Sequence, residues 1–174
     1  MDDRFTVRQS VFDTALGGGP GGLPGRLCRL LRRDLGMDAV TISLLGRGPH
    51  QHVCYASDVA ALGLEALQFA LDEGPSVRAA ALGRPVVVPD LRGHRWRRPA
   101  FRPLTRTPPP ETGALYAFPL RFRGRVLGAV GLIRNTPGAP SEEEYERCAT
   151  AAGAVAVVLL DDYRRLDGDS PPSP

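Results

Sequence analysis

The chain has 174 residues, a length that suits one globular domain with its own hydrophobic core. All 22 basic side chains are arginine and 19 residues are acidic, so the formal net charge of +3 is too small to indicate nucleic-acid binding by itself. The longest mostly apolar run, 149–160, is about half of a membrane span, and the N-terminal ten residues contain no apolar signal segment. We therefore expect a cytoplasmic protein.

Three cysteines, Cys28, Cys54 and Cys148, lie far apart and show no spacing typical of a metal site. We expect reduced thiols buried in the core, and no metal. The glycines at 17–22 formally match a phosphate-binding pattern, but no strand precedes them, so the run is interpreted as a flexible break. The sequence identifies no cofactor.

The chain divides into a flexible N-terminal segment (1–22), a folded domain (23–166) and a disordered tail (167–174). The first segment contains a weak helical pattern, interpreted as a tail or a loosely attached helix. A firmer helix begins at Pro24 and ends at Gly36, with leucines on one stripe and arginines mostly on the other side. Its basic side is interpreted as a solvated face.

A hairpin follows this helix. Residues 38–45 are rich in β-branched side chains, 46–49 form a turn, and 52–56 form the returning strand. Ser57 or Asp58 can cap the next helix, which carries Leu64, Leu67, Gln68 and Leu71 on a largely apolar face.

Residues 72–75 break this helix, because Gly74 permits a positive φ and Pro75 can open a second helix. That helix ends at Gly83, and a short buried strand follows at 85–88. Residues 92–111 hold six arginines and several prolines, and we expect a semi-ordered loop. That this loop flanks or covers a ligand pocket is implied by the family resemblance described below. RNA or an acidic partner could bind this loop, but a solvated loop is the simpler interpretation.

The clearest hairpin joins 113–122 to 125–134, with Pro119 indicating a bulge or an unpaired edge. Ser141 and Glu144 form a capping box that starts a helix running to about Arg165. This helix is apolar nearly all round: Ala151, Ala154, Val155 and Val158 are left over after one stripe covers the sheet. We predict a homodimer through the terminal helices, with residues 1–16 covering this stripe as the alternative.

Three stretches resemble the GAF domain, and more narrowly the actinobacterial type often found with ANTAR modules: LEALQFALDEGPS (64–76), GRPVVVPDL (83–91) and YAFPLRFRGRVLGAVGLIR (116–134). Relatives commonly read GEGPC where this chain reads DEGPS. The resemblance implies an α/β (α+β) fold: a central antiparallel sheet of five or six strands, terminal helices on one face and a ligand pocket on the other. No output module is expected after Leu166.

The resemblance implies a non-enzymatic regulatory or sensor domain in signal transduction. Such a domain would bind a small molecule or a protein partner and signal through dimerisation or that partner. The resemblance also implies seven pocket residues: Ser43, Cys54, Phe69, Glu73, Trp96, Tyr116 and Phe118. The alternative is a small enzyme that uses thiol or acid–base chemistry at Cys54 and Glu73. GAF-type methionine-sulfoxide reductases group their cysteines around the pocket, and the placement of Cys28 and Cys148 on terminal helices argues against that activity.

Overall fold

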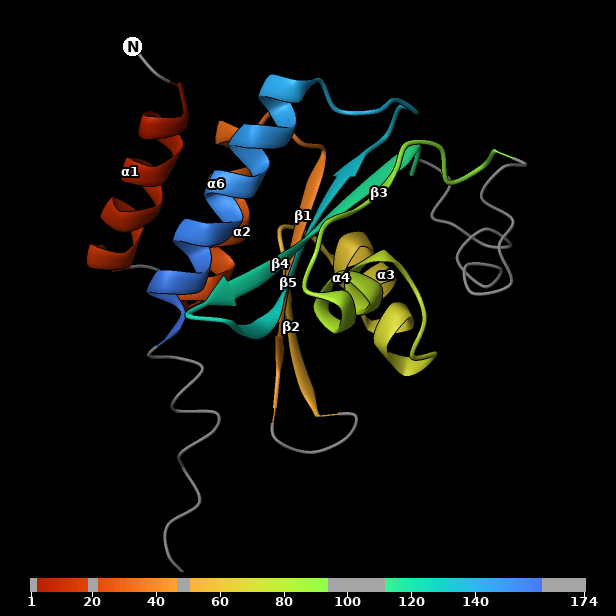
Figure 1. The fold of residues 1–174 in the computed structure, drawn as a ribbon, viewed down its shortest axis with the longest axis horizontal. Coiled ribbons are helices and arrows are strands. Elements are labelled where there is room, and N and C mark those ends of the chain that lie inside the picture. Colours follow the sequence, from red (N-terminus) through yellow and green to blue (C-terminus); the bar gives the residue numbers. More distant parts are fainter. Residues whose placement is uncertain (1–2, 19–21, 47–50, 94–111, 161–174) are drawn as a thin grey trace, which may run out of the picture.

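The computed structural model describes residues 3–18, 22–46, 51–93 and 112–160 (Figure 1). Its centre is a five-stranded antiparallel sheet in the order β2-β1-β5-β4-β3, with helices on both faces. This arrangement confirms the α/β fold class and the expected sheet. None of the helices in the described part of the chain is long and apolar enough to cross a membrane.

The elements follow the sequence prediction closely, and the weak helical pattern at the N-terminus corresponds to a helix. In chain order they are α1 (Asp3–Leu16), α2 (Gly22–Asp34), β1 (Ala39–Leu45), β2 (His52–Ala56), α3 (Val59–Ala70), α4 (Pro75–Leu82), β3 (Val86–Val88), β4 (Ala114–Phe122), β5 (Arg125–Arg134) and α6 (Glu142–Val158). The helix predicted to reach Arg165 is described only as far as residue 160, and the expected tail lies outside the described residues.

The predicted signals fix the ends of the helices. Asp58 caps α3 by accepting a hydrogen bond from the Ala61 N–H, and Gly83 ends α4 in the left-handed conformation. Gly74 precedes Pro75 with a φ of 131°, a value that L side chains rarely adopt. Ser141 forms the predicted capping box at the start of α6.

The sheet face under α2 and α6 is apolar. Alternate residues of each strand point to this side, because side chains on a strand alternate between the two faces of a sheet. Val40, Ile42 and Leu44 of β1 lie here with Leu27 and Leu31 of α2. Pro119 is accommodated in β4 because the pairing with β3 ends at Ala117 and a bulge follows Leu120.

The N-terminal segment forms a helix, which was one of the two interpretations of its sequence, rather than a tail. Residues 3–16 form α1, which packs against α6 and α2, and its Val7 and Val11 are buried in the same core as Val155 of α6 (Figure 1). Ala151, Ala154 and Val155 are each at most 5% exposed. The apolar stripe that suggested a dimer through the terminal helices is therefore covered by α1 of the same chain.

The other sheet face is covered by α3 and α4 (Figure 1). The face of α3 that contacts the sheet consists of Ala61, Leu64, Glu65 and Gln68. Of the four residues predicted to form a largely apolar helical face, Leu64 and Gln68 are buried, whereas Leu67 and Leu71 are 36% and 41% exposed. The buried side of the helix includes the polar Glu65 instead, which finds buried partners.

Candidate functional site

Small side chains line the sheet where α3 and α4 cover it. Ala39, Thr41 and Ser43 of β1 lie beside Ala129 and Gly131 of β5 on this side. A Cβ atom at residue 131 would overlap the Thr41 hydroxyl and would lie 3.3 Å from Ser76 Oγ. Glycine at this position therefore lets polar side chains from the helices reach the sheet.

A buried polar cluster fills this space, centred on Glu65. The Glu65 carboxylate accepts three hydrogen bonds: from Ser43 Oγ (2.5 Å), Gln68 Nε2 (2.9 Å) and Ser76 Oγ (3.0 Å). Gln68 in turn accepts from the Ser76 backbone N–H (2.9 Å). Each of these four residues is at most 1% exposed, so the cluster joins β1, α3 and α4 away from solvent.

Within the described residues the Glu65 cluster contains no ion pair, so its carboxyl is held by neutral donors. Burial raises the pKa of Glu65, and the hydrogen bonds from Ser43 and Ser76 oppose that rise. A buried carboxyl with an elevated pKa is a frequent feature of functional sites, although structural networks show it too. Here the hydrogen bonds account for its burial.

The three cysteines do not form a reactive group. Cys28 and Cys148 lie in the apolar core beneath the terminal helices, and burial raises the pKa of each thiol to about 12. Cys54 is half-buried on β2, with its Sγ 3.5 Å from Ser43 Oγ, and burial raises its pKa as well. Because the thiolate is the reactive form, these environments are unlike those of nucleophilic cysteines.

Four of the seven predicted pocket residues are associated with the α3 side. Ser43 belongs to the Glu65 cluster, Cys54 borders it, and Phe69 stacks on His52 with ring centroids 4.6 Å apart. A smaller cavity of about 240 Å³ adjoins this stacked pair. Glu73 follows α3, and its backbone N–H donates to the Gln68 carbonyl while its carboxylate has no partner in the described part of the chain. The predicted loop, from residue 94 on, and Trp96 lie outside the described residues.

Tyr116 and Phe118 lie on the opposite face of the sheet from the expected pocket. Both belong to the apolar core under α6, where Phe118 packs against Tyr145 at a centroid distance of 5.2 Å. The Tyr116 hydroxyl donates to the Gly138 carbonyl at 2.5 Å. Their neighbours Leu115 and Ala117 face α3 and α4 instead, because adjacent strand residues point to opposite faces.

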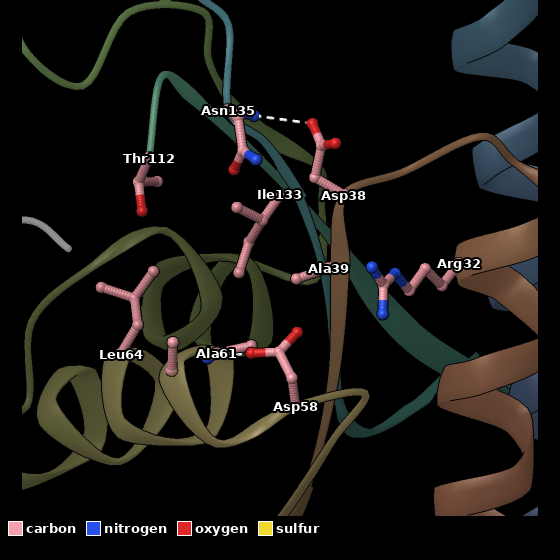
Figure 2. Close-up of a pocket in the computed structure, with 10 residues that line it drawn as sticks. Arg32, Asp38, Ala39, Asp58, Ala61, Leu64, Thr112, Ile133 and Asn135 are labelled. Carbon is pink, nitrogen blue, oxygen red and sulfur yellow. Dashed lines mark hydrogen bonds between the residues drawn. The ribbon is translucent and has the colours of Figure 1, made fainter. Parts of the chain in front are cut away.

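A cavity of about 470 Å³ lies between the start of α3 and the adjacent ends of β1 and β5 (Figure 2). Its apolar wall includes Leu64 of α3 and Ile133 of β5. Polar side chains approach it from the ends of several elements. The ten lining residues are Arg32, Asp38, Ala39, Asp58, Ala60, Ala61, Leu64, Thr112, Ile133 and Asn135.

Both carboxylates at the cavity are partly satisfied by the chain itself. Asp38 accepts from the Asn135 backbone N–H at 2.8 Å, as Figure 2 shows, and Asp58 accepts from Ala61 N and from Ser57 Oγ. Arg32 reaches the cavity from α2 and is exposed. The lining therefore combines both signs of charge with hydroxyl and amide groups. No group of three or more His, Cys, Asp or Glu side chains in the described ranges is placed to hold a metal ion.

Sequence reasoning missed Glu65, Ser76 and all of the polar cavity residues. For the cluster, a signal was present: Glu65 and Gln68 are the only polar side chains in α3, and their spacing of three places them on one helical face. For the cavity, no local signal exists. Asp38, Asp58 and Asn135 lie just outside separate elements, and only the fold brings them together.

Comparisons with known proteins agree on the fold. No curated protein matches the chain. The chain is similar to the GAF domain of an Acinetobacter phosphoenolpyruvate-protein phosphotransferase, with a TM-score of 0.71 and 15% identity over 96% of both chains. It is also similar to free methionine-R-sulfoxide reductase from Neisseria meningitidis, solved with its substrate, with a TM-score of 0.64 and 14% identity over 95% of this chain and 94% of that one.

A third similar structure is the chromophore-binding domain of a bacteriophytochrome from R. palustris, with a TM-score of 0.63 and 11% identity over 90% of this chain and 61% of that one. At these identities the similarities show the fold alone. The family model for the GAF domain matches residues 25–159, which span β1 to β5, the covering helices and the cavity. The chain therefore belongs to the GAF domain family.

Proposed function

We propose that this GAF domain is a non-enzymatic sensor that binds a small polar molecule in the cavity at the start of α3. The cavity itself carries the proposal. Its volume of about 470 Å³ suits a metabolite-sized ligand, and its apolar wall is combined with a few convergent polar groups, as in typical small-molecule sites. Arg32 can pair with an acidic group of the ligand, while Asp38 and Asp58 can accept from an amino or hydroxyl group.

Binding is favoured over catalysis by the surroundings of the candidate catalytic groups. An enzyme that used Cys54 would need a stabilised thiolate, but burial raises the pKa of that thiol. Glu73 has no partner in the described part of the chain that would position it as an acid or base. Binding of RNA or an acidic partner through the arginine-rich loop is kept as a lesser alternative, because the loop from residue 94 on lies outside the described residues. A cytoplasmic location is also part of the proposal.

The site is first tested by native mass spectrometry of the purified protein, because a retained molecule would reveal the chemistry of the ligand. Thermal-shift screening then uses amino acids, nucleosides and small carboxylic acids as probes. A probe that raises the melting temperature is compared in Arg32→Ala and in Arg33→Ala, the matched control. Arg33 is a neighbouring exposed arginine of α2 that pairs with Asp34 and does not line the cavity.

We expect Arg32→Ala to weaken binding of an acidic probe by about tenfold or more, since an ion pair or a charged hydrogen bond is lost. Arg33→Ala should bind as the wild type does. Equal loss in both variants would indicate a general charge effect, and equal retention in both would place the ligand elsewhere. Either result would count against this cavity as the sensor site.

A further inference from the structure

The side chains of α3 are distributed opposite to those of an ordinary surface helix. Its two polar side chains face the sheet, and its solvent side is apolar. The exposed residues of the helix and its C-terminal cap contain no charged or polar side chain; they are Val59, Ala60, Leu62, Gly63, Ala66, Leu67, Ala70 and Leu71. Val59 is 86% exposed, and Leu62, Leu67 and Leu71 are 36–41% exposed. Such a contiguous apolar face usually marks an interface.

Gly63 lies at the centre of this face. At 100° per residue it has Ala70 and Val59 within about 40° on one side and Leu67 within about 40° on the other. Glycine inside a helix is unfavourable by about 1 kcal/mol relative to alanine. A Cβ atom at residue 63 would meet nothing within 4 Å, so no contact within the described chain explains the glycine. Close approach of a second backbone does explain it.

We propose that two copies of this chain pair through the exposed face of α3, antiparallel and about a two-fold axis. This register sets Gly63 against Ala66 of the second copy and the protruding Val59 against the small Ala70. Leu62 and Leu67 lie about 140° apart around the helix and flank this central strip on opposite edges. The face is therefore compatible with a second copy of itself, with the large Val59 opposite the small Ala70 and small residues at the centre, as an isologous contact requires.

The charges near α3 are compatible with this pairing. The paired face carries no charge, so two copies with a net charge of +3 meet without like charges at its centre. The Asp58 carboxylate is turned back to cap its own helix at Ala61 N, away from the face. Antiparallel helices also place opposite ends of their macrodipoles side by side.

The size of the face sets the expected strength. Twelve residues of helix span about 18 Å. Two such faces bury on the order of 1,000 Å² in total, which is at the lower limit for specific interfaces. The dimer is therefore weak and forms as protein concentration rises. This inference does not depend on the proposed ligand site.

Sedimentation equilibrium of the full chain over a range of protein concentrations tests the proposal. We expect the wild type to shift from monomer to dimer. Leu67→Glu should weaken the dimer by at least about tenfold, because it places a charge in the apolar contact. The matched control is Val157→Glu on α6, where Val157 is 42% exposed; it should dimerise within about twofold of the wild type.

Gly63→Gln gives a second test that separates dimerisation from folding. Glutamine favours a helix over glycine, so the melting temperature of the dilute monomer should stay equal or rise. The added side chain should nevertheless weaken the dimer by at least about tenfold, because it prevents close approach. A mixture of Gly63→Cys and Ala66→Cys proteins should also form disulfide-linked heterodimers, which a mixture of Gly63→Cys and Val157→Cys proteins should not.

Three results would overturn the inference. The first is a wild type that stays monomeric at every concentration, which would leave the face to a different partner. The second is a dimer that Leu67→Glu and Gly63→Gln leave intact. The third is a dimer that dissociates in Val157→Glu alone, which would place the contact on the terminal helices.

Discussion

The two faces of the sheet are built from different materials. Under α1, α2 and α6 the strands contribute large apolar side chains such as Phe118 and Leu132, which form a continuous core. Under α3 and α4 the same strands contribute small and polar residues beside larger apolar ones such as Leu115, and the covering helices supply Glu65, Gln68 and Ser76. The terminal-helix face thus derives stability from apolar burial, while the α3 face combines a smaller apolar cluster with buried hydrogen bonds beside a cavity.

This difference between the two faces predicts how each face responds to amino-acid substitutions. Apolar packing is non-directional and survives small rearrangements, whereas a buried polar cluster must keep every partner. Variants on the two faces should therefore fail in different ways. The terminal-helix face should lose stability at every pH, and the α3 face should respond to pH and to local geometry.

The largest effect is expected on the terminal-helix face, at Val11 of α1. Val11→Asp would place a charge at a position that is 0% exposed. It should lower the free energy of unfolding by about 3–5 kcal/mol, since no buried partner offsets the charge. Thr6→Asp, at an exposed position of the same helix, is the control and should change stability by less than about 0.5 kcal/mol. Equal melting temperatures for both variants would show that α1 is not packed as described.

The second effect is at Gly74, where α3 and α4 are joined. A Cβ atom there would lie 2.5 Å from Gln68 Oε1 and 2.7 Å from Gln68 Cγ, at a φ of 131°. Gly74→Val should therefore cost about 2–4 kcal/mol through backbone strain and displacement of Gln68. Gly153→Ala in α6, where a Cβ meets nothing within 4 Å, should instead raise the free energy of unfolding by as much as about 1 kcal/mol. Chemical denaturation measures both, and a Gly74→Val protein as stable as the wild type would contradict the strained loop.

The third effect depends on pH. Burial raises the pKa of Glu65 above its unfolded value of about 4.3, so the folded protein keeps a proton that the unfolded chain has already released. This contribution to stability is fully present below the unfolded pKa and is lost as pH rises through the folded pKa. Glu65→Gln removes the titration while keeping an amide that can hydrogen-bond with Ser43 and Ser76.

The stability of Glu65→Gln relative to the wild type should therefore increase as pH rises from the unfolded pKa to the folded pKa of Glu65, by up to about 1.4 kcal/mol for each unit between the two pKa values. Urea denaturation at several pH values measures this difference. Glu143→Gln, at an exposed position of α6, is the control. A constant difference between Glu65→Gln and the wild type across the range would mean that Glu65 does not titrate there.

The smallest effect concerns thiol reactivity and leaves stability unchanged. A thiol reagent near neutral pH should label native Cys54 slowly and should not label Cys28 or Cys148, whose pKa values are raised to about 12 by burial. All three should react after unfolding. Rapid labelling of native Cys54, at the rate of a free thiol or faster, would instead favour the enzyme alternative.

Much of the fold could be predicted from local signals. The bounds of β2, the caps of α3 and α4 and the capping box of α6 follow from residues within a few positions of each other. The site could not be predicted in the same way. The choice of Tyr116 and Phe118 as pocket residues depended on which residues of β4 face α3, and a register error of one residue exchanges the two faces.

The contact face of α3 shows a second limit. Leu64, Leu67 and Leu71 have helical spacing, and their apolar character favoured the core. The partners that allow Glu65 to be buried, Ser43 and Ser76, come from β1 and α4, and their nearness is a property of the tertiary structure. Hydrophobicity predicts that apolar residues can be buried, but it does not predict which polar residues will be.

Asp58 has two roles that connect separate parts of the domain. Its carboxylate caps α3 at Ala61 N, and its side chain also lines the cavity. A ligand that hydrogen-bonds to Asp58 would therefore contact the residue that caps the helix on which the proposed dimer depends. If the two events are coupled, thermodynamic reciprocity requires that each changes the affinity of the other by the same factor. Ligand affinity measured in dilute and in concentrated protein would then differ, and the ratio of the two affinities would give the coupling free energy between the proposed ligand site and the proposed dimer contact.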